Sequence, residues 1–397
     1  MEAFALEFAN LLLRWLHVIA AIAWIGESIY FVMLDNSLHP PRSLQSKKQG
    51  VFGEMWSVHG GGFYHNQKYL TNPAELPDDL HWSFWKAYVT WLSGFGLFAV
   101  MYLFNPAFYL VNPDSPWVWA AAMSGTQASA VAVLFLVLGY ILYSQMCRRI
   151  SPNMERDGLL SAVVGIMMVV TAYLSIQIFP GRAAFLITGA LMATCMSANV
   201  FFWIIPGQRR MVNALKAGQS PNPLDGQRGK QRSVHNTYFT LPVVFLMLSN
   251  HYSFTYTGPN AWIVMSLFIF AGAVIRQYFV LRHSGKNQLA YPATGIIMLA
   301  AIAWLAAPTA QTTITSGTIS LDQVRTIVAA RCIECHSAKP TQTGFASAPA
   351  GIMFDAPEQI VAHATQIKQV VASRYMPLAN MTRMTDAERA AIASWVQ

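Results

Sequence analysis

The chain has 397 residues, of which 54% are hydrophobic and only 11% are charged. Ordinary soluble domains carry about 25% charged residues, so the composition excludes a soluble globular protein for most of this chain. The formal net charge of +8 does not indicate nucleic acid as a partner, because no nucleic-acid-reading motif is present and the basic residues cluster between apolar runs.

Eight apolar runs are long enough to cross about 30 Å of hydrocarbon. Most of them lack the polar face that a helix at the surface of a soluble protein shows. The predicted spans are residues 11–34, 86–104, 118–142, 158–179, 183–205, 235–252, 260–282 and 291–308. Residues 1–308 are therefore predicted to form a polytopic membrane domain, with the lipid bilayer as a partner.

Lys and Arg are distributed unevenly between the predicted loops. The loops after spans one, three, five and seven carry sixteen of these residues, whereas the loops after spans two, four and six carry only Arg182. Cytoplasmic loops are enriched in basic residues. The odd-numbered loops, including the long connections 35–85 and 206–234, are thus predicted to be cytoplasmic, and both ends of the membrane domain to lie outside.

Ionisable residues lie inside spans one and six, where they are costly and indicate function. Span one carries His17 toward the outer face and Glu27 deeper, and span six ends near His251. His17 and His251 are predicted to lie at similar depth, where two imidazoles could ligate a b-type haem between helices. A helix–helix hydrogen bond is the alternative for each of them.

The C-terminal part of the chain differs in composition from the rest. A Thr- and Ser-rich linker is predicted over 309–319, followed by a small domain over 320–397. This domain contains Cys332-Ile333-Glu334-Cys335-His336, the Cys-x-x-Cys-His signature of covalent haem c attachment, in which the His is an axial iron ligand.

A helical pattern precedes the haem motif, and a second one follows Tyr375-Met376-Pro377. This order is typical of a class I cytochrome c, in which a Met completes the iron coordination. Met376 is the predicted sixth ligand, with Met381, Met384 and then Met353 as alternatives. The fold class expected from the sequence is thus all-α, an eight-helix transmembrane bundle followed by a class I cytochrome c domain.

With these motifs, the whole chain resembles the membrane-bound, cytochrome c-linked urate oxidases of bacterial purine degradation. Besides the haem motif, the resemblance rests on segments at Arg14-Trp15-Leu16-His17, His59-Gly60-Gly61-Gly62-Phe63-Tyr64, Leu80-His81-Trp82, Trp91-Leu92-Ser93-Gly94 and from Arg232-Ser233-Val234-His235-Asn236-Thr237-Tyr238 to Ser249-Asn250-His251-Tyr252.

The resemblance implies oxidation of urate to 5-hydroxyisourate. Electrons would leave through haem c to a soluble cytochrome c or a terminal oxidase and not directly to O₂. It also implies a bacterial inner-membrane location with the cytochrome domain in the periplasm. Urate binding needs Arg or amide donors, an aromatic surface and a base. His59, His235 or Glu27 is the expected base, and Asn236, Gln67 and Tyr238 are the expected carbonyl partners.

Two questions stay open at the level of sequence. The substrate site lies either in the outer half of the membrane, near His17 and His251, or on the cytoplasmic side. The cytoplasmic site is preferred, and it requires a haem b relay because electrons do not tunnel across the ~30 Å hydrocarbon core. The alternative function is a membrane electron-transfer subunit, from quinol or a partner enzyme to cytochrome c, with no small-molecule catalysis of its own. A transporter or redox sensor is less favoured, because no inverted repeat is apparent.

Overall fold

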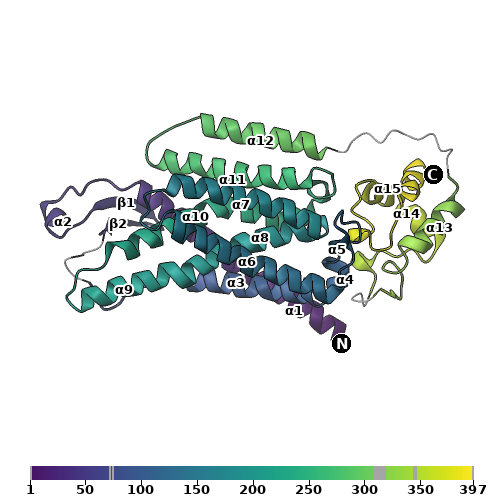
Figure 1. The fold of residues 1–397 in the computed structure, drawn as a ribbon, viewed down its shortest axis with the longest axis horizontal. Coiled ribbons are helices and arrows are strands. Elements are labelled where there is room, and N and C mark those ends of the chain that lie inside the picture. The colour runs from purple at the N-terminus through teal and green to yellow at the C-terminus, as the bar shows by residue number, and fades with distance from the viewer. Residues whose placement is uncertain (1, 71–72, 74–75, 308–318, 343–346, 396–397) are drawn as a thin grey trace.

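A computed structural model of the chain describes residues 2–70, 73, 76–307, 319–342 and 347–395. Long helices lie side by side in a bundle, and a small helical domain lies against one end of it (Figure 1). The N-terminus lies at the same end of the bundle as the C-terminal domain, whereas β1, β2 and α9 lie at the opposite end.

The first three quarters of the chain contain the helices α1 (Glu2–Asn36), α2 (Leu44–Lys48), α3 (Trp85–Phe98), α4 (Pro106–Tyr109), α5 (Val118–Ala121), α6 (Gly125–Ile150), α7 (Asp157–Ile178), α8 (Gly181–Asn199), α9 (Ile205–Lys216), α10 (Pro223–Leu248), α11 (Ala261–His283) and α12 (Ala290–Ala306). Short turns extend or follow some of them, namely the π-helical η1 (Ala99–Leu103) and η2 (Val200–Ile204) and the 3₁₀ turns η3 (Ser249–His251) and η4 (Ser253–Thr255).

Five helical segments among the described residues are long and apolar enough to cross a membrane: Phe8–Asn36, Gly125–Ile150, Asp157–Ile178, Gly181–Lys216 and Ala261–His283. These segments confirm a multi-pass helical membrane protein. The other predicted spans fall on the short α3, on α10 with its polar first half, and on the shorter apolar α12. The count of eight spans therefore stays a prediction.

The third predicted span, 118–142, is displaced in the structure. Only the single turn α5 forms at 118, and the long helix α6 begins at Gly125 and ends at Ile150. Ser124 and Gln127 explain this start, because they form a capping box: the Ser124 hydroxyl accepts from the Gln127 amide at 3.3 Å, and the Gln127 side chain accepts from the Ser124 amide at 2.8 Å. Local capping thus outweighed the hydrophobic run in placing this helix.

The predicted cytoplasmic loop 206–234 is largely helical. Helix α9 continues directly from η2, and α10 begins at Pro223, which Asn222 caps by accepting from the Leu224 amide at 3.0 Å. Arg210 and Asp225 pair across the turn at 2.5 Å. Interpreting this segment as an ordinary loop was wrong, because N-capping and a Pro at the first helical position favour a helix here.

A β-hairpin in the first long connection, which the sequence analysis did not predict, is added to an otherwise helical structure. Strands β1 (Gly53–His59) and β2 (Gly62–Lys68) pair antiparallel, with Trp56 opposite His65. Gly60 and Gly61 both have positive φ, +60° and +82°, as a two-residue type I′ turn requires. The alternating apolar and polar residues on either side of this Gly pair favour a strand pair.

The C-terminal domain has its own hydrophobic core. Its helices are α13 (Leu321–Arg331), α14 (Pro357–Ala362), α15 (Ala364–Ala372) and α16 (Asp386–Ser394), with 3₁₀ turns η5 (Pro349–Gly351) and η6 (Leu378–Asn380). Val324, Val328, Ile367, Ile392 and Trp395 are buried together between them. The predicted linker 309–319 lies outside the described residues except for Ile319.

Candidate functional site

The Cys-x-x-Cys-His motif lines a large cavity where the C-terminal domain meets the end of the bundle, because Tyr109 and Arg182 also belong to its lining. The cavity has a volume of about 660 Å³, and Cys332, Cys335 and His336 face it together with Met376. Both cysteines are free thiols. Burial, followed by the neighbouring Cys335, raises the pKa of Cys332 to about 12.

The imidazole of His336 is oriented for iron ligation. Its Nδ1–H donates to the Ile352 carbonyl at 2.9 Å, and its ring lies 5.2 Å from the Phe354 ring. A hydrogen bond of this kind fixes the ring and the tautomer of a metal-ligating His and leaves Nε2 for the metal. The residues present therefore fit a covalently attached haem held by Cys332, Cys335 and His336.

Three of the four methionines considered as sixth ligand line the same cavity. Met376, Met381 and Met384 face it, whereas Met353 does not belong to its lining. Met384 is only 3% exposed and packs in the domain core. The structure thus keeps Met376 as a candidate, with Met381 and Met384 as its alternatives.

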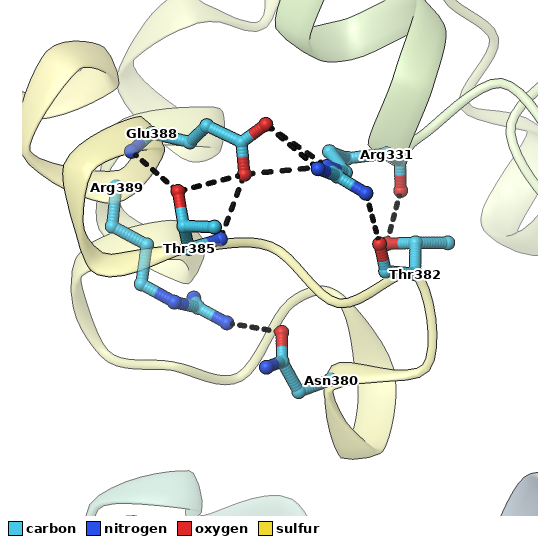
Figure 2. Close-up of polar contacts among 6 residues, drawn as sticks. All are labelled: Arg331, Asn380, Thr382, Thr385, Glu388 and Arg389. Atoms are coloured by element: carbon cyan, nitrogen blue, oxygen red, sulfur yellow. Dashed lines mark hydrogen bonds and ion pairs between the residues drawn. The ribbon is translucent and has the colours of Figure 1, made fainter.

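Two arginines hold the loop that carries these methionines. Arg331, the residue before Cys332, donates to the Thr382 carbonyl at 2.5 Å and to the Glu388 carboxylate at 3.0 Å (Figure 2). The Thr382 hydroxyl donates back to the Arg331 carbonyl at 3.0 Å. Burial opposes ionisation of Glu388, but the Thr385 amide and Arg331 outweigh it and lower the pKa of Glu388. Helix α13 is thereby tied to both the loop and α16.

Arg389 fastens the other side of this loop. It is only 3% exposed and donates to the carbonyls of Val371 at 3.0 Å and Met376 at 2.8 Å. Its guanidinium also donates to the Asn380 side chain at 2.9 Å (Figure 2). The position of Met376 is therefore set by a buried side chain of α16.

Replacing Met376 with alanine is expected to leave the haem covalently attached but to remove the methionine–iron charge-transfer band, because a thioether ligand would be lost. The measurement is the visible and near-infrared spectrum of the oxidised protein, with Met381→Ala as the matched control. A band that survives in Met376→Ala and disappears in Met381→Ala or Met384→Ala would assign the ligand to the other residue.

The predicted catalytic residues do not form one site. Glu27 pairs with Lys86 at 3.0 Å and accepts from the Ser83 hydroxyl, which links α1 to the start of α3. His59 is exposed at the end of β1. These two candidate bases therefore lie on different elements, Glu27 on α1 and His59 on β1.

The remaining predicted residues are also separated. Gln67 on β2 donates to Ser46 at 3.1 Å. Tyr238 on α10 donates to the Gln277 side chain on α11. His235 and Asn236, one turn earlier on α10, are buried and belong to a different cluster.

His17 and His251 have different surroundings. The His17 Nδ1–H donates to the Thr90 carbonyl at 3.0 Å and lies 3.1 Å from the Ser93 hydroxyl, so the ring is held against α3. His251 is exposed on η3. Ligation of a b-type haem by this pair stays a prediction.

A second polar cluster is buried where α6, α8 and α10 meet. The Asn199 amide donates to the Tyr143 hydroxyl and to the Asn236 side chain, both at 2.9 Å. Tyr143 lies 2.8 Å from Nδ1 of His235. The Asn199 carbonyl oxygen accepts from Arg232 at 3.4 Å. The structure thus brings His235 and Asn236 together with three residues that the sequence analysis did not single out as site residues.

A cavity of about 260 Å³ adjoins this cluster at the end of the bundle away from the C-terminal domain. Arg148, Trp203, Arg228 and Arg232 are among its lining residues. Sequence reasoning assigned Arg232 to a basic loop and so missed this cavity. A signal was present, because Arg232 precedes His235 and Asn236 by one helical turn, and residues at this spacing share a helix face.

Comparison with known proteins identifies the membrane domain. A family model described as "Urate oxidase N-terminal" matches residues 3–307. No curated protein and no solved structure matches the chain. The family match covers more than half of the chain and does not include the haem motif. The chain belongs to the urate oxidase N-terminal family.

Proposed function

We propose that this protein is a membrane-bound urate oxidase that oxidises urate to 5-hydroxyisourate and delivers the electrons to haem c in its own C-terminal domain. In this proposal eight spans place both ends of the chain in the periplasm of the bacterial inner membrane. A soluble cytochrome c or a terminal oxidase then accepts the electrons, and O₂ does not react with urate directly.

The observation that carries the proposal is the presence of both parts in one chain. The urate oxidase N-terminal match ends at residue 307, and a cavity lined by Cys332, Cys335, His336 and Met376 follows it. A haem held by His and Met supplies a one-electron acceptor of raised potential. The N-terminal part thus supplies the relation to urate, and the C-terminal part supplies the route for electrons.

The stoichiometry of the reaction defines what the protein must handle. One urate and one water give one 5-hydroxyisourate, two protons and two electrons, with the water oxygen becoming bonded to C5 of the purine. The protein must therefore bind a planar anion, accept or release protons beside it, and pass on electrons one at a time.

The substrate site is proposed to face the cytoplasm, where the loops rich in Lys and Arg are predicted to lie. The C-terminal domain lies at the opposite end of the bundle (Figure 1). Because the hydrocarbon core is about 30 Å thick, a relay between the two ends is needed. A b-type haem near His17 and His251 is the proposed relay, since the Nδ1 hydrogen bond of His17 leaves its Nε2 for a metal.

The proposal is tested with oxidised, anaerobic membranes that contain the full-length protein. Urate is expected to produce the reduced c-type α band without O₂, and dithionite gives the total reducible haem as the reference. An additional b-type band would support the relay. If dithionite reduces the haem but urate does not, the electron-transfer subunit becomes the better interpretation.

A further inference from the structure

We propose that the 260 Å³ cavity lined by Arg148, Trp203, Arg228 and Arg232 is the site that binds urate, as a planar anion entering from the cytoplasmic side. This inference rests on the proposed function, since that function supplies the identity of the anion. It adds the location of the site, its electrostatic basis and the residues that hold it.

The charge of Arg232 is the strongest indication. The side chain is 2% exposed, yet no carboxylate among the described residues forms an ion pair with it. Asp157, an acid at this end of the bundle, accepts instead from Ser151 at 2.6 Å and Gln231 at 2.7 Å. A buried cation without a counter-ion is costly. An anion in the cavity that Arg232 lines would provide the missing charge.

Two aromatic rings contact the Arg232 guanidinium beside the cavity. The Arg232 guanidinium lies 4.8 Å from the centre of the Trp203 ring and 5.2 Å from that of Tyr143. Arg148 lies 5.9 Å from the same Trp203 ring. Cation–π contacts of this kind stabilise a guanidinium without neutralising it. Two positive charges therefore lie beside one indole in one cavity.

The polar cluster behind the cavity holds Arg232 in place. Asn199 accepts from Arg232 through its carbonyl oxygen and donates through its amide to Tyr143 and Asn236. These bonds fix which way the Asn199 amide points, and His235 in turn contacts Tyr143. His235 and Asn236 thus act as positioning residues for the anion site. Such preorganisation lowers the cost of binding.

The dimensions of the cavity suit a small ligand. Its volume lies just under the ~300 Å³ lower end of common small-molecule sites. Arg148 and Arg228 belong to the end of α6 and the first turns of α10, at the end of the bundle away from the C-terminal domain. A compact, flat anion is therefore the ligand class expected, and it would reach the site without crossing the membrane.

The test is calorimetric titration of urate into the full-length detergent-purified protein, reduced beforehand with dithionite under anaerobic conditions so that no turnover occurs. The Kd for urate is expected to rise at least about 10-fold in Arg232→Gln and severalfold in Arg228→Gln, because each removes a charge facing the ligand. Arg149→Gln is the matched control, since Arg149 is an exposed neighbour of Arg148 outside the cavity lining. Its Kd should equal that of the wild type.

The outcomes separate the site from the function. Arg228 is less buried than Arg232, so its variant gives a result even if Arg232→Gln fails to fold, and far-UV circular dichroism with thermal melting of each variant reports folding of the membrane domain. If wild-type protein binds urate and both folded variants bind equally well, the site assignment is overturned while the proposed function stands. If the wild type neither binds urate nor is reduced by it, both are overturned.

Discussion

Replacing His336 with alanine is expected to lower urate-dependent reduction of a soluble cytochrome c by more than about 100-fold. The imidazole lines the cavity and is held by the Ile352 carbonyl at 2.9 Å. Loss of an outer partner of a metal-bound His already costs about 10–100-fold, so loss of the ligand itself should exceed this. The measurement is the rate of cytochrome c reduction by anaerobic membranes, alongside the spectrum of the haem.

His363→Ala is the matched control for this experiment. His363 lines the same cavity, and its Nδ1–H donates to the Gln359 carbonyl at 2.9 Å, but it is not part of the Cys-x-x-Cys-His motif. We expect its variant to keep a low-spin haem and most of the activity. A low-spin spectrum that is unchanged in His336→Ala but altered in His363→Ala would show that the axial ligand has been misassigned.

Replacing Arg389 with methionine is expected to destabilise the C-terminal domain by about 1–3 kcal/mol, because it leaves the Met376 carbonyl without its donor, whereas the Val371 carbonyl still accepts from the Arg374 amide at 3.1 Å. The loss of the Asn380 contact should also free the loop that carries Met376. Urea unfolding of the full-length protein, followed at the haem Soret band, measures the stability. The methionine–iron charge-transfer band reports whether the loop still holds Met376 at the iron.

Arg374→Met serves as the comparison for Arg389→Met. Arg374 pairs with Asp386 at 2.6 Å, but the two side chains are 53% and 76% exposed. An exposed pair contributes about 0–1 kcal/mol, so this variant should unfold almost as the wild type does. Equal destabilisation in the two variants would mean that the hydrogen bonds of Arg389 to the loop do not stabilise the domain.

Features that depend on residues close together in the chain could be predicted from the sequence. The Cys-x-x-Cys-His motif is local, and the structure places all three of its functional side chains on one cavity. Apolar runs located α7, α11 and α12 to within two residues at each end, since hydropathy acts along the chain. The hairpin at 53–68 and the start of α6 at Gly125 were missed, although Gly60-Gly61 and the Ser124–Gln127 capping box are also local signals.

The sequence by itself determined the membrane character, the basic loops and the haem motif, because each depends on residue type and spacing along the chain. Only the tertiary structure decided which polar residues share a site. It separates Glu27, His59 and Tyr238, and it assembles Arg232, Trp203, Tyr143 and Asn199 from α6, η2, α8 and α10. From sequence alone, Arg232 is interpreted as a solvated loop residue. Only the packing shows that its side chain is buried without a counter-ion.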